Sequence, residues 1–421
     1  MDTIFALSSG RPPAAVSVIR ISGPAAHDAG QAIAGSLPDA RHAGVRELRD
    51  PRSGELLDEA LVLRFDSPAS STGENIVELQ CHGGRAVVDA VLAALASLER
   101  LRLAEPGEFT RRAFENGRID LTEAEGLADL IEAETESQRK AALVLAEGGL
   151  RKQIADWQER LLTLSAEAER SIDYDEDDVV PVGLQSECAS LASELQDWLE
   201  RPRIEPLKRG VLVVVAGPPN AGKSSLINAI AGEERAIVTD VPGTTRDHIE
   251  VPLALGGVPV VLTDTAGLRS TEDRVEAIGV ERAARLVENA DVLVWLGASD
   301  EAPDHPRLVR VYPKADWGGD APAGSIPVSS VTHEGLGTLL QAIGAHAASL
   351  LPAEDAIALN RRQSSHIAEA REAIEGAAAA DQVLIVAENL RQARSAFDRL
   401  TGRAGVEDVL DALFGRFCLG K

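Results

Sequence analysis

The chain has 421 residues, a mass of 44.5 kDa and a formal net charge of −25, and these values already exclude several classes of protein. At roughly 150 residues per domain, the length predicts about three domains. Hydrophobic residues make up 44% and charged residues 26%, which excludes an intrinsically disordered chain. Because acidic residues (67) outnumber lysine plus arginine (42), any nucleic acid must be held by a local basic surface.

The cysteines and the start of the chain bear on location. Cys81, Cys188 and Cys418 are too few and too far apart for a disulfide framework or a clustered thiolate metal site. The first residues show no basic leader followed by a long apolar segment, and no run of about 18 apolar residues occurs anywhere. We therefore expect a cytoplasmic protein that does not bind membranes.

The first 115 residues mix strand-like and helical patterns. Short runs rich in β-branched residues predict strands over 16–21, 61–65 and 76–79. Residues 85–98 carry apolar side chains at helical spacing and predict a helix. This region is expected to form an α+β domain.

Long helices are predicted on both sides of a region of different character. Residues 120–200 are rich in Ala, Leu and Glu and nearly free of Gly and Pro, and the chain after about 350 has the same composition. Pro202 and Pro206 end the first helical region. Because neither helical segment is large enough to be a domain alone, we expect them to form one helical domain interrupted by an insertion.

The inserted region alternates strand and helix. It begins with residues 211–216, a continuous apolar run typical of a strand buried on both faces of a parallel sheet. Further strands are predicted over 258–263, 291–296, 308–311 and 326–329. The helical segments between them predict a doubly wound α/β domain.

A phosphate-binding loop joins the first of these strands to a helix. Residues 217–224 (GPPNAGKS) match the pattern G-x-x-x-x-G-K-[ST]. In such a loop the backbone N–H groups and the helix N-terminus favour phosphate, and the lysine, here Lys223, neutralises β- and γ-phosphate charge. The hydroxyl of Ser224 is a candidate Mg²⁺ ligand.

Two later segments complete a nucleotide site. Asp264 ends a predicted strand and is followed by Thr265-Ala266-Gly267, where the carboxylate can hold Mg²⁺ through water and the glycine N–H can meet a γ-phosphate. Between the two motifs, residues 243–247 (GTTRD) offer Thr245 as a second hydroxyl for the metal and can order around the γ-phosphate.

The base is predicted to be guanine. GTPases usually carry Asn-Lys-x-Asp after the next strand, and residues 313–316 read Pro-Lys-Ala-Asp. Asp316 can accept hydrogen bonds from the guanine N1–H and amino group, whereas Pro313 removes one side-chain partner. Ser329-Ser330-Val331 is similar to the last guanine-facing loop. We expect a preference for GTP over ATP, with weakened affinity.

Distinctive motifs run along the chain outside the phosphate loop. They are residues 19–23 (IRISG), 78–84 (ELQCHGG), 106–109 (PGEF), 116–121 (NGRIDL) and 417–421 (FCLGK). On these motifs the chain closely resembles the MnmE (TrmE) family of bacterial tRNA-modifying GTPases. The resemblance implies a multidomain fold: an N-terminal α+β folate-binding and dimerisation domain (1–116), a helical domain (117–206 and 346–421), and a P-loop Ras-like G domain (207–345) inserted in it.

The resemblance also implies activity and partners. With a flavin-dependent partner, MnmG, the family adds an aminomethyl or carboxymethylaminomethyl group at C5 of the tRNA wobble uridine. A homodimer, a heterotetramer with FAD-binding MnmG, and tRNA are implied. A K⁺ ion bound by Asn220, Thr239, Val241 and Thr244 takes the role of an arginine finger when two G domains pair, and Glu276 orients the attacking water. Leu268 stands where many GTPases use glutamine, and it cannot orient water.

The cofactors and site residues follow from these motifs. GTP, Mg²⁺ and K⁺ are expected in the G domain, with Mg²⁺ on Ser224 and Thr245. The full nucleotide-binding set is Asn220, Ala221, Gly222, Lys223, Ser224, Ser225, Thr239, Asp240, Val241, Pro242, Gly243, Thr244, Thr245, Asp264, Thr265, Ala266, Gly267, Lys314, Asp316, Ser329, Ser330 and Val331. The resemblance places 5-formyl- or 5,10-methylene-tetrahydrofolate on Arg20, Glu78, Arg118 and Lys421.

Two function classes remain open at the level of the sequence. One is a modification enzyme in which GTP hydrolysis drives a conformational cycle coupled to uridine chemistry. The other is a regulatory or assembly GTPase that binds ribosomal RNA or protein without modification chemistry. A simple switch needs neither the Arg20, Glu78 and Arg118 set nor the terminal FCLGK motif, so these features favour the enzyme.

Overall fold

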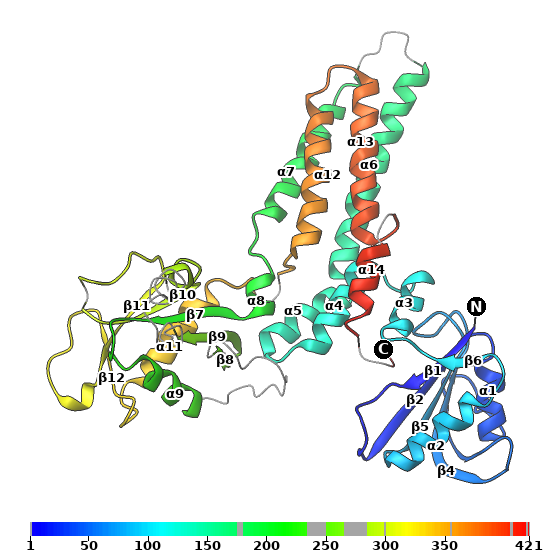
Figure 1. Cartoon of the computed structure of the whole chain (residues 1–421). Coiled ribbons are helices and arrows are strands. Elements are labelled where there is room, and N and C mark those ends of the chain that lie inside the picture. The colour runs from blue at the N-terminus through cyan, green and yellow to red at the C-terminus, as the bar shows by residue number, and fades with distance from the viewer. Residues whose placement is uncertain are drawn as a thin grey trace, which may run out of the picture. The chain divides into compact units, whose positions relative to one another are not determined.

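The computed structural model describes residues 2–174, 180–233, 250–264, 284–298, 300–353, 356–404, 407–417 and 420 (Figure 1). The chain divides into two compact units, each assembled from separate stretches of sequence. Unit 1 comprises residues 1–128, 146–156 and 397–421, and unit 2 comprises residues 129–145 and 157–396.

Unit 1 contains a six-stranded sheet in the order β3-β4-β5-β2-β1-β6. All neighbours are antiparallel except β1 and β6, which are parallel. The strands are β1 (Thr3–Leu7), β2 (Val16–Ser22), β3 (Ala43–Arg49), β4 (Leu56–Phe65), β5 (Ile76–His82) and β6 (Leu101–Leu103). The helices α1 (Ala26–Ala34), α2 (Arg85–Ala96) and α3 (Glu108–Glu115) accompany them.

Alternation along the strands divides the side chains between the two faces of this sheet. Phe5, Ile19 and Leu79 are fully buried and belong to one core with residues of α1 and α2. Ile4 points the other way and packs with Phe109 of α3. The three predicted strands and the helix over 85–98 are therefore confirmed, and β1, β3, β6, α1 and α3 are added by the structure.

Helices dominate the regions on either side of the second sheet. They are α4 (Leu121–Glu132), α5 (Glu136–Ala146), α6 (Gly149–Tyr174), α7 (Leu184–Leu199), α12 (Arg361–Ala379), α13 (Val383–Thr401) and α14 (Glu407–Phe414). Helices α7 and α12 lie side by side although about 170 residues separate them (Figure 1). Trp157 and Trp198 meet edge to face with ring centroids 5.2 Å apart. The predicted helical domain with an insertion is confirmed.

The second sheet, in unit 2, has the order β12-β11-β10-β7-β9-β8. Its strands are β7 (Val211–Ala216), β8 (Glu250–Leu255), β9 (Val258–Asp264), β10 (Val292–Leu296), β11 (Leu308–Pro313) and β12 (Ile326–Val328). All pairs are parallel except β8 with β9. The short elements around it include α8 (Glu205–Arg209), α9 (Lys223–Glu233), the 3₁₀ turn η2 (Ala315–Trp317) and α11 (Leu336–Ala348).

Helices cover both faces of this sheet. Leu226 of α9 and Leu339 of α11 pack on one face with Val213 and Val260. On the other face, Val214 packs with Leu286 from a helical stretch at 284–288. The predicted doubly wound fold is confirmed, whereas the domain boundaries 116/117, 206/207 and 345/346 stay predictions. Among the described helices, none combines the length and apolar character that crossing a membrane requires.

Candidate functional sites

The loop between β7 and α9 has the backbone shape of a phosphate cradle. Gly217 has φ +152°, and a Cβ there would lie 2.3 Å from the carbonyl oxygen of Leu296, so the loop needs glycine at this position. Asn220 adopts the left-handed conformation with φ 61°. The helix that follows starts at Lys223, so its unpaired N–H groups and positive dipole end face the loop.

Lys223 closes over this loop. Its Nζ donates hydrogen bonds to the carbonyl oxygens of Gly217 at 3.0 Å and Pro218 at 2.9 Å, and the residue is 6% exposed. An ammonium group held at this position gives the cradle a fixed positive charge. The arrangement suits an anion of high charge density, such as a polyphosphate.

Ser224 and Asp264 meet at the same edge of the sheet. The Ser224 hydroxyl donates to Asp264 Oδ2 at 2.6 Å, and Asp264 is 1% exposed. Strands β7 and β9 are parallel, with Val215 opposite Asp264, so the end of β9 lies beside the start of the loop. A hydroxyl and a carboxylate are hard oxygen donors of the kind that Mg²⁺ prefers. The residues present therefore fit the expected metal.

A cavity of about 170 Å³ collects the predicted base-binding residues. Lys314 has φ 59°, and its Nζ lies 4.4 Å from the centre of the Trp317 ring. Asp316 lines the same cavity, between these two side chains in sequence. The described residues of the predicted set that line it are Ala221, Gly222, Ser225, Lys314, Asp316, Ser330 and Val331. The phosphate loop and the two predicted base loops are thus brought together.

The side chains of the loop over 329–331 have two different roles. Ser329 is fully buried, and its Oγ accepts hydrogen bonds from the backbone N–H groups of Val331 at 3.2 Å and Thr332 at 3.1 Å. Ser329 therefore shapes the loop, while Ser330 and Val331 line the cavity. Trp317 was not predicted as part of this site. In the sequence, only its position directly after Asp316 indicates that Trp317 belongs to this cavity.

Part of the predicted site lies outside the described residues. This holds for Thr239, Asp240, Val241, Pro242, Gly243, Thr244, Thr245, Thr265, Ala266, Gly267, Glu276 and Lys421, and also for Cys418 and Leu268.

In unit 1, Arg20 and Glu78 form an ion pair across two strands. They are opposite residues of β2 and β5, and Arg20 Nε donates to Glu78 Oε1 at 2.9 Å. The Arg20 guanidinium carbon lies 5.6 Å from the centre of the Phe109 ring. The side chains are 24% and 16% exposed, so both reach solvent. The pair offers a cation, an anion and an aromatic face together.

The other predicted folate residues are placed separately. Arg118 is exposed and lies against Gly73, where a Cβ would be 3.2 Å from Arg118 Cγ. Within the described chain, Arg118 makes no hydrogen bond or ion pair with Arg20 or Glu78. Near the chain end, a Cβ on Gly420 would lie 2.0 Å from the carbonyl oxygen of Leu7. Leu7 belongs to β1 and is opposite Ile19 of β2, so Gly420 lies against the strand next to the one that carries Arg20.

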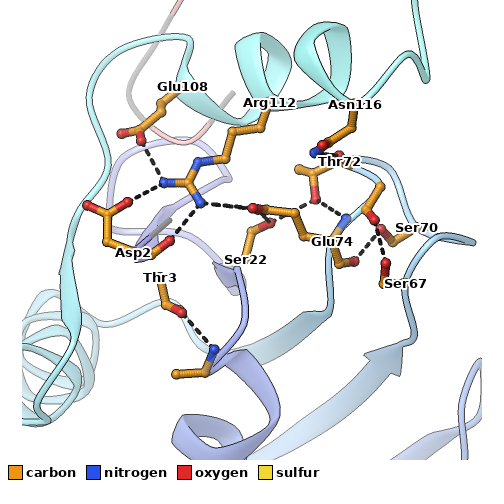
Figure 2. A network of polar contacts seen from close by, with 12 residues as sticks. Asp2, Thr3, Ser22, Ser67, Ser70, Thr72, Glu74, Glu108, Arg112 and Asn116 are labelled. Atoms are coloured by element: carbon orange, nitrogen blue, oxygen red, sulfur yellow. Dashed lines mark hydrogen bonds and ion pairs between the residues drawn. The ribbon is translucent and has the colours of Figure 1, made fainter.

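A buried polar network supports this part of unit 1, and Figure 2 shows its arrangement around Arg112. Arg112 donates to Glu108 at 2.9 Å, to Glu74 at 3.2 Å, and to both the carboxylate and the carbonyl oxygen of Asp2 at 2.9 Å. Its side chain is 9% exposed. One guanidinium therefore joins α3, the chain start and the segment before β5.

The charges in this network shift one another's pKa values. Hydrogen bonds from Arg102 lower the pKa of Asp2. Burial alone would raise the pKa of Glu108, but hydrogen bonds from Arg102, the Glu105 backbone and Arg112 outweigh it, and the net shift is downward. For Arg112, burial opposes the charge, and Glu108 and Glu74 raise its pKa overall. Asp2, Glu108 and Arg112 are thus held in their charged forms at neutral pH.

Two models of known protein families together match nearly the whole chain. The family model described as "GTP-binding protein TrmE N-terminus" matches residues 3–118, and the model described as "MnmE helical domain" matches residues 121–418. A protein of Novosphingobium aromaticivorans named tRNA modification GTPase MnmE is 51% identical over 438 residues, covering 100% of both chains.

Other relatives carry the same name. A protein of Rhizorhabdus wittichii is 52% identical over 427 residues, covering 100% of this chain and 97% of its own. One of Erythrobacter litoralis is 51% identical over 425 residues and the full length of both chains. Among solved structures, the G domain of the T. maritima FeoB iron transporter is 26% identical over 32% of this chain and 98% of its own, with a TM-score of 0.24.

Proposed function

Because this chain belongs to the MnmE family of tRNA modification GTPases, we propose that its GTP hydrolysis drives the addition of an aminomethyl or carboxymethylaminomethyl group to tRNA. The group is added at C5 of the wobble uridine, and the flavin-dependent partner MnmG takes part in the reaction. That the protein hydrolyses GTP and takes part in tRNA modification follows from the family itself.

The observation that carries the nucleotide part of the proposal is the meeting of Ser224 with Asp264 beside Lys223. Lys223 and the α9 N-terminus hold the β- and γ-phosphates. Ser224 and Thr245 would hold Mg²⁺, with Asp264 holding it through water, and the bound ion would offset the charge that develops between the β- and γ-phosphates. Asp316 accepts hydrogen bonds from the guanine edge, and Lys314 and Trp317 border the base.

Hydrolysis itself calls for groups beyond the phosphate loop. Leu268 has no polar atom to orient water, so Glu276 takes this role through a bridging water. Asn220, Thr239, Val241 and Thr244 bind K⁺, Val241 through its carbonyl oxygen. Pairing of the two G domains of a homodimer completes the site.

The N-terminal domain supplies the one-carbon donor. Arg20, Glu78, Arg118 and Lys421 bind 5-formyl- or 5,10-methylene-tetrahydrofolate, which carries carbon at the oxidation level of the added methylene. The partly exposed pair of Arg20 and Glu78 beside Phe109 supports this, because it offers both charges and a ring face to a pterin. Gly420 against Leu7 supports a role for the chain end.

We assign the domains as residues 1–116 (folate-binding and dimerisation), 117–206 with 346–421 (helical) and 207–345 (G domain). In the cytoplasm, this chain forms a homodimer, and the homodimer forms a heterotetramer with FAD-binding MnmG. The junction near residue 206 is supported by the two connections that meet there, where the Ile204 N–H donates to the Leu359 carbonyl at 3.3 Å.

Two measurements test the proposal. Purified protein should hydrolyse GTP much faster in potassium than in sodium buffer, and Glu276→Ala should bind GTP normally but hydrolyse it slowly in a single turnover. In a strain lacking the gene, mass analysis should show wobble uridines without the C5 group, restored by the wild-type gene. Normal wobble uridines in that strain would instead favour a regulatory or assembly GTPase.

A further inference from the structure

Two connections join the helical domain to the inserted α/β domain, and they lie side by side. The backbone N–H of Ile204 donates to the carbonyl of Leu359 at 3.3 Å, and the backbone N–H of Arg361 donates to Glu205 Oε1 at 2.6 Å. Helices α7 and α12 pack against each other next to this junction. The nucleotide and folate sites proposed above use none of these residues.

A groove of about 590 Å³ opens at the junction. Its residues come from the end of α7, the connection to α8, the start of α8 and the first two turns of α12: Leu199, Arg203, Glu205, Arg361, Ser364, Ser365 and Ala368. Three of its polar side chains, Arg203, Arg361 and Ser365, are exposed. The groove is therefore open to a large ligand that approaches from solvent.

The charge of the groove is unusual for this acidic chain. Neither the Arg203 nor the Arg361 guanidinium makes an ion pair or hydrogen bond within the part of the chain that the structure describes. Some other surface arginines are held by carboxylates, as Arg209 is by Asp291 at 2.7 Å. Glu205 is the single acidic residue of the lining, and its carboxylate already accepts the Arg361 N–H. The balance favours an anion.

A second observation points to a ligand in the same groove. Ser364 is 3% exposed, and its Oγ has no hydrogen-bond partner among the described residues. A buried hydroxyl without a partner carries an unfavourable desolvation cost, which a ligand oxygen can remove. The positive dipole end of the 19-residue helix α12, which starts at Arg361, adds to the potential there.

We propose that this groove binds a backbone phosphate of the RNA on which the protein acts. Guanidinium groups match phosphate oxygens through paired hydrogen bonds, and an exposed groove admits a polymer chain. A net charge of −25 requires such a local basic site before RNA can approach. Arg201, whose guanidinium carbon lies 3.7 Å from the centre of the Trp198 ring, extends the basic surface beside it. The inference rests on the proposed function in tRNA modification.

The test compares tRNA affinity of the full-length chain and its variants over a range of salt. The double substitution Arg203→Gln with Arg361→Gln should weaken tRNA binding at least about tenfold. It should also reduce the slope of log affinity against log salt by about 1, because the contact with one phosphate is lost. Arg391→Gln on α13 is the matched control, since Arg391 pairs with Glu388 at 2.7 Å outside the groove.

Further arms separate the outcomes. Arg203→Lys with Arg361→Lys should keep the salt slope but lose part of the affinity, because lysine cannot form the paired hydrogen bonds. Thermal unfolding curves verify that each variant folds. Unchanged tRNA affinity and slope in the glutamine variant, with wobble uridines still modified by the wild type, would overturn the inference and leave the proposed function standing. A thermal shift by inorganic phosphate that the glutamine variant loses, without any change in tRNA affinity, would also overturn it.

Discussion

The hydroxyl of Ser224 and the carboxylate of Asp264 are 2.6 Å apart although 40 residues separate them in sequence. Strands β7 and β9 are parallel neighbours, so their carboxyl ends deliver both side chains to one edge of the sheet. The metal-binding half of the phosphate site thus depends on strand pairing rather than on the phosphate loop alone.

Asp264→Asn should therefore slow GTP hydrolysis by about a hundredfold or more, because a neutral amide holds Mg²⁺ far less well than a carboxylate. The amide has the same shape, so the fold should persist. Initial rates against Mg²⁺ concentration should show the variant requiring more metal. Asp291→Asn, at the opposite end of the sheet, is the control, and an equal loss there would remove the special role of Asp264.

Asp316→Asn should reverse base preference. The carboxylate accepts from the guanine N1–H and amino group, whereas an amide donates one hydrogen bond and complements xanthine. Isothermal titration should show GTP binding weakened at least about tenfold and a xanthosine nucleotide bound more tightly than by wild type. Pro313→Asn should strengthen GTP binding by restoring the missing partner. Equal affinity of wild type for GTP and ATP would contradict the assignment of this loop.

Arg20→Gln should weaken tetrahydrofolate binding about tenfold, because the variant loses the cation and leaves Glu78 without its partner. A fluorescence titration with 5-formyl-tetrahydrofolate measures this loss. Arg46→Gln on β3 is the matched control, because Arg46 is a partly exposed arginine of the same domain that donates to Ser36. Unchanged folate affinity in Arg20→Gln would remove the pair from the folate site.

Arg112→Gln should lower the free energy of unfolding by about 3 kcal/mol at pH 7, because the buried carboxylate of Glu74 loses its ion pair and Glu108 keeps only Arg102. Chemical denaturation of both proteins gives this difference.

The same network predicts how stability depends on pH. The pKa of Glu108 and the pKa of Asp2 are lowered in the folded state, so their stabilisation is present above their unfolded values near 4 and is lost as pH falls through the folded values. The wild type should therefore lose stability in acid more steeply than Arg112→Gln. Parallel unfolding curves of the two proteins between pH 7 and 3 would show that Arg112 does not lower these pKa values.

Sequence patterns predicted the elements whose signals are local. The run at β7 and the glycines of the phosphate loop carry their own signal, because a buried parallel strand is apolar throughout and the cradle needs glycine at Gly217. Strand β8 was missed, because its sequence includes Pro252 and it is an edge strand that pairs only with β9. Strand β1 was missed because it is short and its first four residues are all buried, so the sequence shows no alternation.

The sequence by itself determined the chemistry of this protein: the phosphate loop, the acidic residue for the metal and the motifs that place the chain in its family. These are runs of neighbouring residues, and their meaning survives without a fold. Only the tertiary structure decided which distant residues meet, such as Arg112 with Asp2 or Glu205 with the Arg361 N–H, because each pairing depends on how strands and helices far apart in the chain pack together.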